Sequence, residues 1–174
     1  MAAETGKPPY PSARPLTEAA VLVPVFRGRD GCLRIVLVRR GDGGAHAGEI
    51  AFPGGKREPG DAGLEDTARR EACEEIGLGP ERIEVAAQLP VEETAISRFR
   101  ITPYLARINP PDAWKRCDGE IAEVIEASVA ELALSASGGG GPPSCRVGPH
   151  RVWGATYRIL RALLPRLESG EWSF

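Results

Sequence analysis

The sequence predicts a single domain of the α/β class, with mixed strands and two main helices. A chain of 174 residues is long enough for one domain with its own hydrophobic core. Short apolar runs bounded by Gly- and Pro-containing turns indicate strands, and two longer segments repeat apolar residues at helical spacing. No internal repeat is present, so one domain is the simplest organisation.

The N-terminal third predicts an irregular arm followed by a strand hairpin. Prolines interrupt residues 1–17, so we expect an arm there and assign the folded domain to residues 18–174. Residues 19–26 predict a strand, with Pro24 marking an edge or a bulge. A turn over 27–31 leads to a return strand over 33–39.

The remaining elements follow from the same signals. A loop is expected over 41–48, a short apolar piece over 50–52 and a polar loop over 53–63. A helix is expected over 64–76, with Gly77 as a left-handed cap. Strands are predicted over 83–89, 101–108 and 121–125, then a short helix over 128–134 capped by Ser128. A glycine-rich loop over 137–143 precedes a helix over 152–167.

Composition limits the function classes. The net charge is only −2, so the chain as a whole attracts neither nucleic acid nor an anionic membrane. No apolar run is long enough to cross a bilayer, and the N-terminus lacks the apolar stretch of a signal peptide. The four cysteines form no CxxC pair, which favours reduced thiols over a zinc site. We therefore expect a cytoplasmic protein with no nucleic-acid or membrane partner; the sequence leaves a homodimer open.

Three glutamates crowd one border of the apolar face of the predicted helix over 64–76. At about 100° per residue, Glu75 falls inside the apolar arc, Glu71 lies just outside it and Glu74 about 60° further round. Like charges at i,i+3 and i,i+4 repel each other, and partial burial increases the cost. A divalent cation such as Mg²⁺ would reverse these penalties. The alternative is a solvated acidic face.

A glycine-containing segment comes directly before this helix. Gly54 and Gly55 allow backbone N–H groups to approach an anion closely, and Lys56 adds positive charge. Asp61 offers a further carboxylate or a partner for Arg70. Anion donors beside a carboxylate cluster are what phosphoryl chemistry requires, so we assign Gly54, Gly55 and Lys56 to substrate binding.

These residues resemble the Nudix box, Gx5Ex7REUxEExGU, in which U is aliphatic. The segment Arg-Glu-Ala-Cys-Glu-Glu-Ile-Gly-Leu at 70–78 matches its second half in full. Asp61 stands where glutamate is usual, and eight residues separate it from Arg70. Both departures are typical of the coenzyme A diphosphatase branch.

Segments outside the box are similar to that branch as well, at residues 37–39, 46–48, 52–55, 101–103 and 153–154. Its accessory signature has the form LLTxRSxxxRxxxGxVxFPGG. Arg39 matches the first arginine, Arg40 stands at the serine, and Gly44 replaces the second arginine. The missing second basic group leaves ADP-ribose, or another nucleoside diphosphate derivative, open as the substrate.

The resemblance implies an α/β/α sandwich around a mixed sheet and metal-dependent hydrolysis of a diphosphate bond in a nucleotide-like small molecule, coenzyme A first. It implies that Glu71, Glu74 and Glu75 bind Mg²⁺ or Mn²⁺. Arg70 would orient these groups. A non-catalytic domain that binds nucleotides is the alternative of another class, although the box carboxylates are all present.

Other candidates depend on position alone. Glu120 is a candidate fourth ligand or general base, or else an exposed loop acid; Glu92 and Glu93 are further options. Arg39 suits a bidentate contact to substrate phosphate, or is a surface arginine on a strand. Three aromatic residues offer faces for a base but fit core packing better, namely Phe99, Tyr104 and Trp114. His46 fits a hydrogen-bonded loop residue.

Overall fold

The computed structural model describes residues 15–43, 46–135 and 142–174. Its strands are β1 (Thr17–Arg27), β2 (Leu33–Arg40), β3 (Ile50–Ala51), β4 (Gly54–Lys56), β5 (Ile83–Gln88), β6 (Glu92–Glu93), β7 (Phe99–Ile108), β8 (Ile121–Ser128), β9 (Cys145–Val147) and β10 (His150–Val152). Its helices are α1 (Leu64–Ile76), the 3-10 turn η1 (Pro80–Arg82), α2 (Val129–Leu134) and α3 (Gly154–Glu168).

Eight strands form one mixed sheet. The central path is β3-β2-β1-β7-β5; β4 pairs with β1, β6 with β7 and β8 with β2. β1 and β7 run parallel, and the other pairs are antiparallel. β9 and β10 form a separate hairpin.

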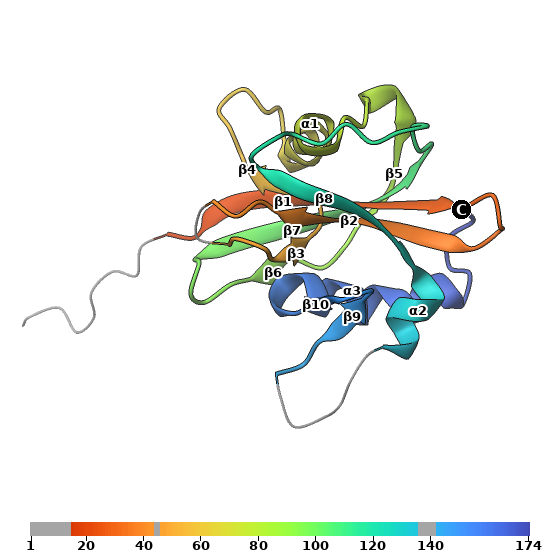
Figure 1. Ribbon diagram of the computed structural model, residues 1–174. Coiled ribbons are helices and arrows are strands. Elements are labelled where there is room, and N and C mark those ends of the chain that lie inside the picture. Colours follow the sequence, from red (N-terminus) through yellow and green to blue (C-terminus); the bar gives the residue numbers. More distant parts are fainter. Residues whose placement is uncertain (1–14, 44–45, 136–141) are drawn as a thin grey trace, which may run out of the picture.

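Helices cover both faces of the sheet (Figure 1). α1 lies on one face, over an apolar cluster that includes Ala68, Ala72 and Ile76. α3, α2 and the β9–β10 hairpin lie on the other face, over a second cluster that includes Leu160 and Leu163. This arrangement confirms the predicted α/β/α sandwich around a mixed sheet.

α1 forms where its sequence predicts and buries the predicted stripe. Ala68, Ala72 and Ile76 are fully buried against the sheet. The helix ends at Gly77, which has a left-handed φ of 66° and donates its N–H to the carbonyls of Ala72 and Cys73. An L-residue with a side chain is disfavoured at that φ, so the glycine fixes where the helix ends.

The prediction that Pro24 marks a sheet edge or bulge is wrong, because β1 lies in the centre of the sheet. Pro24 sits opposite Ala106 of β7. On its other side, β1 pairs with β4 over Ala19–Val21 and with β2 over Val25–Arg27. Pro24 falls in the gap between these partners, where a residue without an N–H interrupts no ladder.

Several boundaries differ from the sequence prediction. Gly54–Lys56 is a strand rather than a loop, because it pairs with β1. β7 and β8 are longer than predicted, and β6 and the β9–β10 hairpin were not predicted. Val152 belongs to β10, so α3 begins at Gly154.

The predicted arm over 1–17 lies outside the described residues except at 15–17, and β1 already includes Thr17. Most of the predicted glycine-rich loop over 137–143 also lies outside them. Ser128 caps α2 as predicted, by accepting the backbone N–H of Glu131. None of the helices in the described ranges is both long enough and apolar enough to cross a membrane.

Candidate active site

The three box glutamates of α1 differ in burial in the order that the helical wheel predicts. The side chain of Glu75 is only 4% exposed, that of Glu71 is 16% exposed and that of Glu74 is 56% exposed. The cluster therefore runs from the sheet–helix interface to solvent along one side of α1. A ligand reaching it from solvent would meet Glu74 first and Glu75 last.

Glu75 is a buried carboxylate with one hydrogen bond and one distant cation. Its Oε2 accepts the backbone N–H of Gly54 at 3.0 Å, and its Oε1 lies 3.8 Å from Nη1 of Arg40. The pKa of Glu75 is raised to about 7, mainly by burial and to a smaller extent by the charges of Glu71 and Glu120, while Gly54 and Arg40 oppose the rise. The folded protein thus contains a carboxylate whose charge is poorly compensated.

Arg70 holds the other acidic groups of the site in place. Its Nη1 donates to Glu71 Oε1 at 3.1 Å and to Glu74 Oε2 at 3.0 Å. Its Nε donates to Asp61 Oδ1 at 2.9 Å, and its Nη2 to Asp61 Oδ2 at 3.1 Å and to the Lys56 carbonyl at 3.1 Å. Every guanidinium nitrogen of Arg70 donates to a neighbouring group, and its predicted role in orienting the catalytic carboxylates stays a prediction.

Asp61 serves as the anchor of Arg70. Its side chain is 4% exposed and also accepts the Thr67 hydroxyl at 2.8 Å and the Glu58 N–H at 2.9 Å. The Arg70 guanidinium, with these other donors, holds the pKa of Asp61 well below its usual range. Asp61 therefore carries a charge that the protein already satisfies, in contrast to Glu75.

Glu71 is intermediate between Asp61 and Glu75 in how well its charge is compensated. Burial raises its pKa, while Arg70 lowers it and the charge of Glu74 adds to the rise. The carboxylate packs against Gly55 so closely that a Cβ at that glycine would lie 2.3 Å from Glu71 Oε1. A side chain at position 55 would displace the carboxylate.

The two glycines of β4 have a role that the sequence did not suggest. The Gly54 N–H is already donated to Glu75. A Cβ at Gly54 would lie 2.4 Å from the Ala20 carbonyl oxygen, so this position must be small for β4 to pair with β1. Gly54 thus allows β4 to approach β1 closely, Gly55 allows it to pass beneath Glu71 of α1, and their contact with a substrate stays a prediction.

Glu120 is brought to the cluster by a backbone clasp. The Cys117 N–H donates to the Glu75 carbonyl at 2.9 Å, which docks the loop before β8 onto the end of α1. The Gly41 N–H donates to the Glu120 carbonyl at 2.7 Å. Glu120 remains exposed, yet its charge acts on Glu75. Its predicted role as a fourth ligand or general base stays a prediction.

Arg39 and Lys56, which the sequence assigns to substrate binding, have other neighbours in the structure. Arg39 lies 3.4 Å from Glu123 Oε2 and 4.0 Å from Asp42 Oδ1. The Lys56 ammonium lies 5.7 Å from the centre of the Phe99 ring. Neither side chain is in contact with the box glutamates, and their roles toward a substrate stay predictions.

The remaining polar and aromatic candidates have structural partners. Glu92 pairs with Arg158 at 2.6 Å, and Glu93 lies 3.7 Å from Arg100. Tyr104 is buried in the α1-side cluster, and Trp114 packs against that cluster and donates to Glu126 at 2.8 Å. His46 interacts with Glu49 at 3.1 Å, as a hydrogen-bonded loop residue would.

Arg40 is the residue that the sequence analysis missed as a member of the site. The family signature has serine at its position, so the resemblance directed attention to Arg39 instead. The alternation of side chains between the two faces of the sheet along β2 could have revealed this position. Val36 and Val38 face the α1-side cluster, and position 40 continues on that face.

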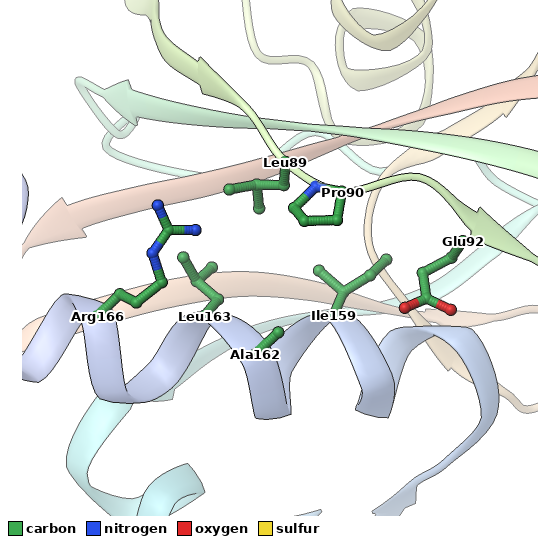
Figure 2. Close-up of a pocket in the computed structure, with 7 residues that line it drawn as sticks. All are labelled: Leu89, Pro90, Glu92, Ile159, Ala162, Leu163 and Arg166. Carbon is green, nitrogen blue, oxygen red and sulfur yellow. The ribbon is translucent and has the colours of Figure 1, made fainter.

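Two concave regions on the described surface lie away from these carboxylates. Figure 2 shows the smaller one, between α3 and the segment after β5, where Ile159 and Leu163 face Leu89 and Pro90. It encloses about 20 Å³, room for about one water molecule. An open groove of about 290 Å³ lies at the C-terminal end of β1, beside Arg27 and Leu33. Glu92 lines the smaller one, and neither is lined by a box glutamate.

The donor set suits a hard divalent cation. In the described part of the chain, no three His, Cys, Asp or Glu side chains converge into a ready-made metal cage. Mg²⁺ does not need one, because it is bound through one or two carboxylates together with water and substrate phosphates. Burial raises the pKa of Glu75 because it disfavours the charged carboxylate, and a nearby cation would stabilise that charged form. The carboxylates of this site therefore suit a divalent cation such as Mg²⁺.

The NUDIX domain family matches residues 16–142, and the chain therefore belongs to the Nudix family. It is a Nudix hydrolase, an enzyme of the class that acts on nucleoside diphosphate derivatives and generally uses divalent metals such as Mg²⁺ or Mn²⁺. Proteins named "Uncharacterized Nudix hydrolase NudL" from Salmonella paratyphi B and Salmonella newport are 34% identical over 160 residues. The match covers 84% of this chain and 80% of each relative.

Solved structures share the fold at low identity. A Caenorhabditis elegans Ap4A hydrolase binary complex has a TM-score of 0.63 at 17% identity, covering 88% of this chain and 99% of that one. The NUDIX domain of Shewanella oneidensis NrtR, complexed with ADP ribose, has a TM-score of 0.61 at 16% identity, covering 91% and 94%. These likenesses support the α/β sandwich.

Proposed function

We propose that this chain hydrolyses the diphosphate bond of coenzyme A or a derivative, using Mg²⁺ or Mn²⁺ bound by Glu71, Glu74 and Glu75. The observation that carries the metal role is the graded row of carboxylates along α1, which ends in a buried Glu75 whose pKa is raised by burial. The branch-like segments at residues 37–39 and 52–55 support the coenzyme A substrate.

A bound divalent cation supplies charge neutralisation for the diphosphate and lowers the pKa of a water molecule. The chain's own residues set the geometry. Arg70 holds Glu71 and Glu74 by hydrogen bonds, and Asp61 holds Arg70 in turn. Gly54 fixes one oxygen of Glu75. Water then attacks one phosphorus, the bridging P–O bond breaks and the second phosphate leaves.

Glu120 is the proposed general base or fourth ligand. It is exposed, and the hydrogen bond from the Cys117 N–H to the Glu75 carbonyl docks its loop against the end of α1. An exposed carboxylate at the edge of the cluster is able to take a proton from an attacking water and release it to solvent. Arg39, Gly54, Gly55 and Lys56 remain the proposed substrate contacts. We also propose a cytoplasmic location; whether the chain forms a homodimer stays open.

The substrate is tested by product analysis with the purified full chain, Mg²⁺ or Mn²⁺, and coenzyme A, ADP-ribose or a dinucleoside polyphosphate. Coenzyme A cleavage releases adenosine 3′,5′-bisphosphate, whereas ADP-ribose gives AMP and ribose phosphate. Gly44 at the position of the second signature arginine favours ADP-ribose as the second candidate, and the ADP-ribose-bound NrtR domain shares the fold. Turnover of ADP-ribose without turnover of coenzyme A would replace the first substrate by the second.

The metal role is tested by Glu74→Gln and Glu75→Gln. We expect each to lower kcat by about 100-fold or more, and a chelator to abolish turnover. Glu65→Gln is the matched control, because Glu65 lies on the same helix and pairs with Arg69 at 3.0 Å. Full activity in both Glu74→Gln and Glu75→Gln would contradict the assignment.

A further inference from the structure

Arg40 is a cation at the buried end of the carboxylate row. It is the last residue of β2, and its side chain is 38% exposed. Its Nη1 lies 3.8 Å from Glu75 Oε1, which is within ion-pair range but beyond a hydrogen bond. The guanidinium thus reaches both the innermost carboxylate and solvent.

The backbone around Arg40 is held on both sides, which fixes where its side chain starts. Its N–H donates to the Glu49 carbonyl at 3.0 Å, and its carbonyl accepts the Gly48 N–H at 3.2 Å. The ladder with β8 shifts register between Arg39 and Arg40. The unpaired residue, Ala122, is on β8, so β2 keeps its alternation up to Arg40, next to the hydrogen bond between Gly41 and Glu120.

The three arginines near the site differ in how much of their hydrogen-bonding capacity the protein uses. Arg70 donates from all three guanidinium nitrogens. Arg39 pairs with Glu123 and Asp42. Across residues 15–43, 46–135 and 142–174, Arg40 has only the long ion pair with Glu75. A guanidinium has five N–H donors, so most of those of Arg40 are available to an anion.

We infer that the Arg40 guanidinium binds a phosphate oxygen of the diphosphate substrate, in addition to facing Glu75. This inference rests on the proposed function. A guanidinium offers a planar, bidentate fork that matches phosphate geometry. Glutamates outnumber cations along this side of α1, so a polyanionic substrate needs positive charge from the protein as well as from bound metal.

The competing role is purely internal, in which Arg40 only neutralises Glu75. A double-mutant cycle separates the two roles. The probe is α,β-methylene-ADP, which mimics the adenosine diphosphate group of coenzyme A and ADP-ribose and has a methylene in place of the bridging oxygen, so it is not cleaved between its phosphorus atoms. Binding is measured by calorimetry, with and without Mg²⁺, so the readout does not require activity.

We expect Arg40→Gln to weaken probe binding tenfold or more, and to do so equally in the wild-type and Glu75→Gln backgrounds. Arg40→Lys keeps the charge and should recover part of the affinity. Arg34→Gln is the matched control, because Arg34 lies on the same strand and pairs with Asp30 at 2.6 Å; it should change affinity less than twofold.

Unchanged binding in Arg40→Gln, or an effect that disappears in the Glu75→Gln background, would overturn the inference. Circular dichroism of each variant checks that it is folded. The proposed function is judged separately, by turnover of diphosphate substrates in the wild-type chain. Turnover with no Arg40 effect on binding rejects only this inference, whereas absence of turnover rejects the function.

Discussion

The sheet face that packs against α3 and the face that packs against α1 differ in the kinds of side chain that they bury. The α3-side cluster consists of hydrophobic side chains, including Leu160, Leu163 and Leu164. The buried polar and charged residues in the described chain all belong to the α1 side: Asp61, Thr67 and Glu75 in or before the helix, and Thr102 opposite Ala20 of the α1-side cluster. The proposed catalytic glutamates therefore lie on the face that also buries polar groups.

The comparison teaches how stability and function are divided in this fold. Apolar burial on the α3 side stabilises the domain without regard to ligands. On the α1 side, Asp61 is fully compensated by Arg70, whereas Glu75 is not. The proposed metal site thus contains one undercompensated carboxylate, for which a bound cation would compensate.

The largest expected effect on stability comes from the α3 face. Leu160→Ala removes a fully buried side chain and should lower the free energy of unfolding by about 2–5 kcal/mol. Because the box glutamates lie on α1, over the opposite face of the sheet, kcat/KM measured well below the unfolding transition should change less than about threefold. Urea unfolding and steady-state kinetics check both parts. A large loss of kcat with normal stability would contradict the proposal that the α3 face contributes stability and the α1 face contributes function.

The second prediction concerns the pH dependence of metal-free stability. Burial raises the pKa of Glu75 to about 7 in the folded protein, from 4.5 when unperturbed. The unfolded chain therefore releases this proton first, and the contribution of Glu75 to stability falls as pH rises from about 4.5 through 7. Relative to Glu75→Gln, the wild type should lose about 3 kcal/mol across this range.

Urea unfolding at pH 5, 6, 7 and 8 with chelator present measures that loss. Added Mg²⁺ should restore stability in the wild type more than in Glu75→Gln. Parallel stability curves for the two proteins would show that the Glu75 charge is already compensated.

The smallest expected effect on folding, with a distinct effect on catalysis, comes from Gly55→Ala. The new Cβ would meet the end of the flexible Glu71 side chain, which is able to move away. Displacing this carboxylate should lower kcat by about 10- to 100-fold with little loss of stability. Gly54→Ala is the contrasting variant, because its Cβ would meet the Ala20 backbone oxygen and should destabilise the fold. Equal stability losses in the two variants would contradict this reading.

The sequence by itself determined the elements whose signals are local. The repeat of apolar residues at every fourth position placed α1, Gly77 set its end, and the same wheel ordered the burial of Glu75, Glu71 and Glu74. Ser128 likewise capped α2 where expected. These features depend on residues within one or two helical turns, so periodicity and capping are sufficient to predict them.

Only the tertiary structure decided which distant groups meet. Sheet order placed Pro24 in a central strand and turned Gly54–Lys56 into a strand beneath α1. It brought Arg40 rather than Arg39 to Glu75, across 35 positions of the chain, and it clasped Glu120 to Gly41. Pairing between strands far apart in sequence depends on the packing of the whole sheet, and no local pattern encodes it.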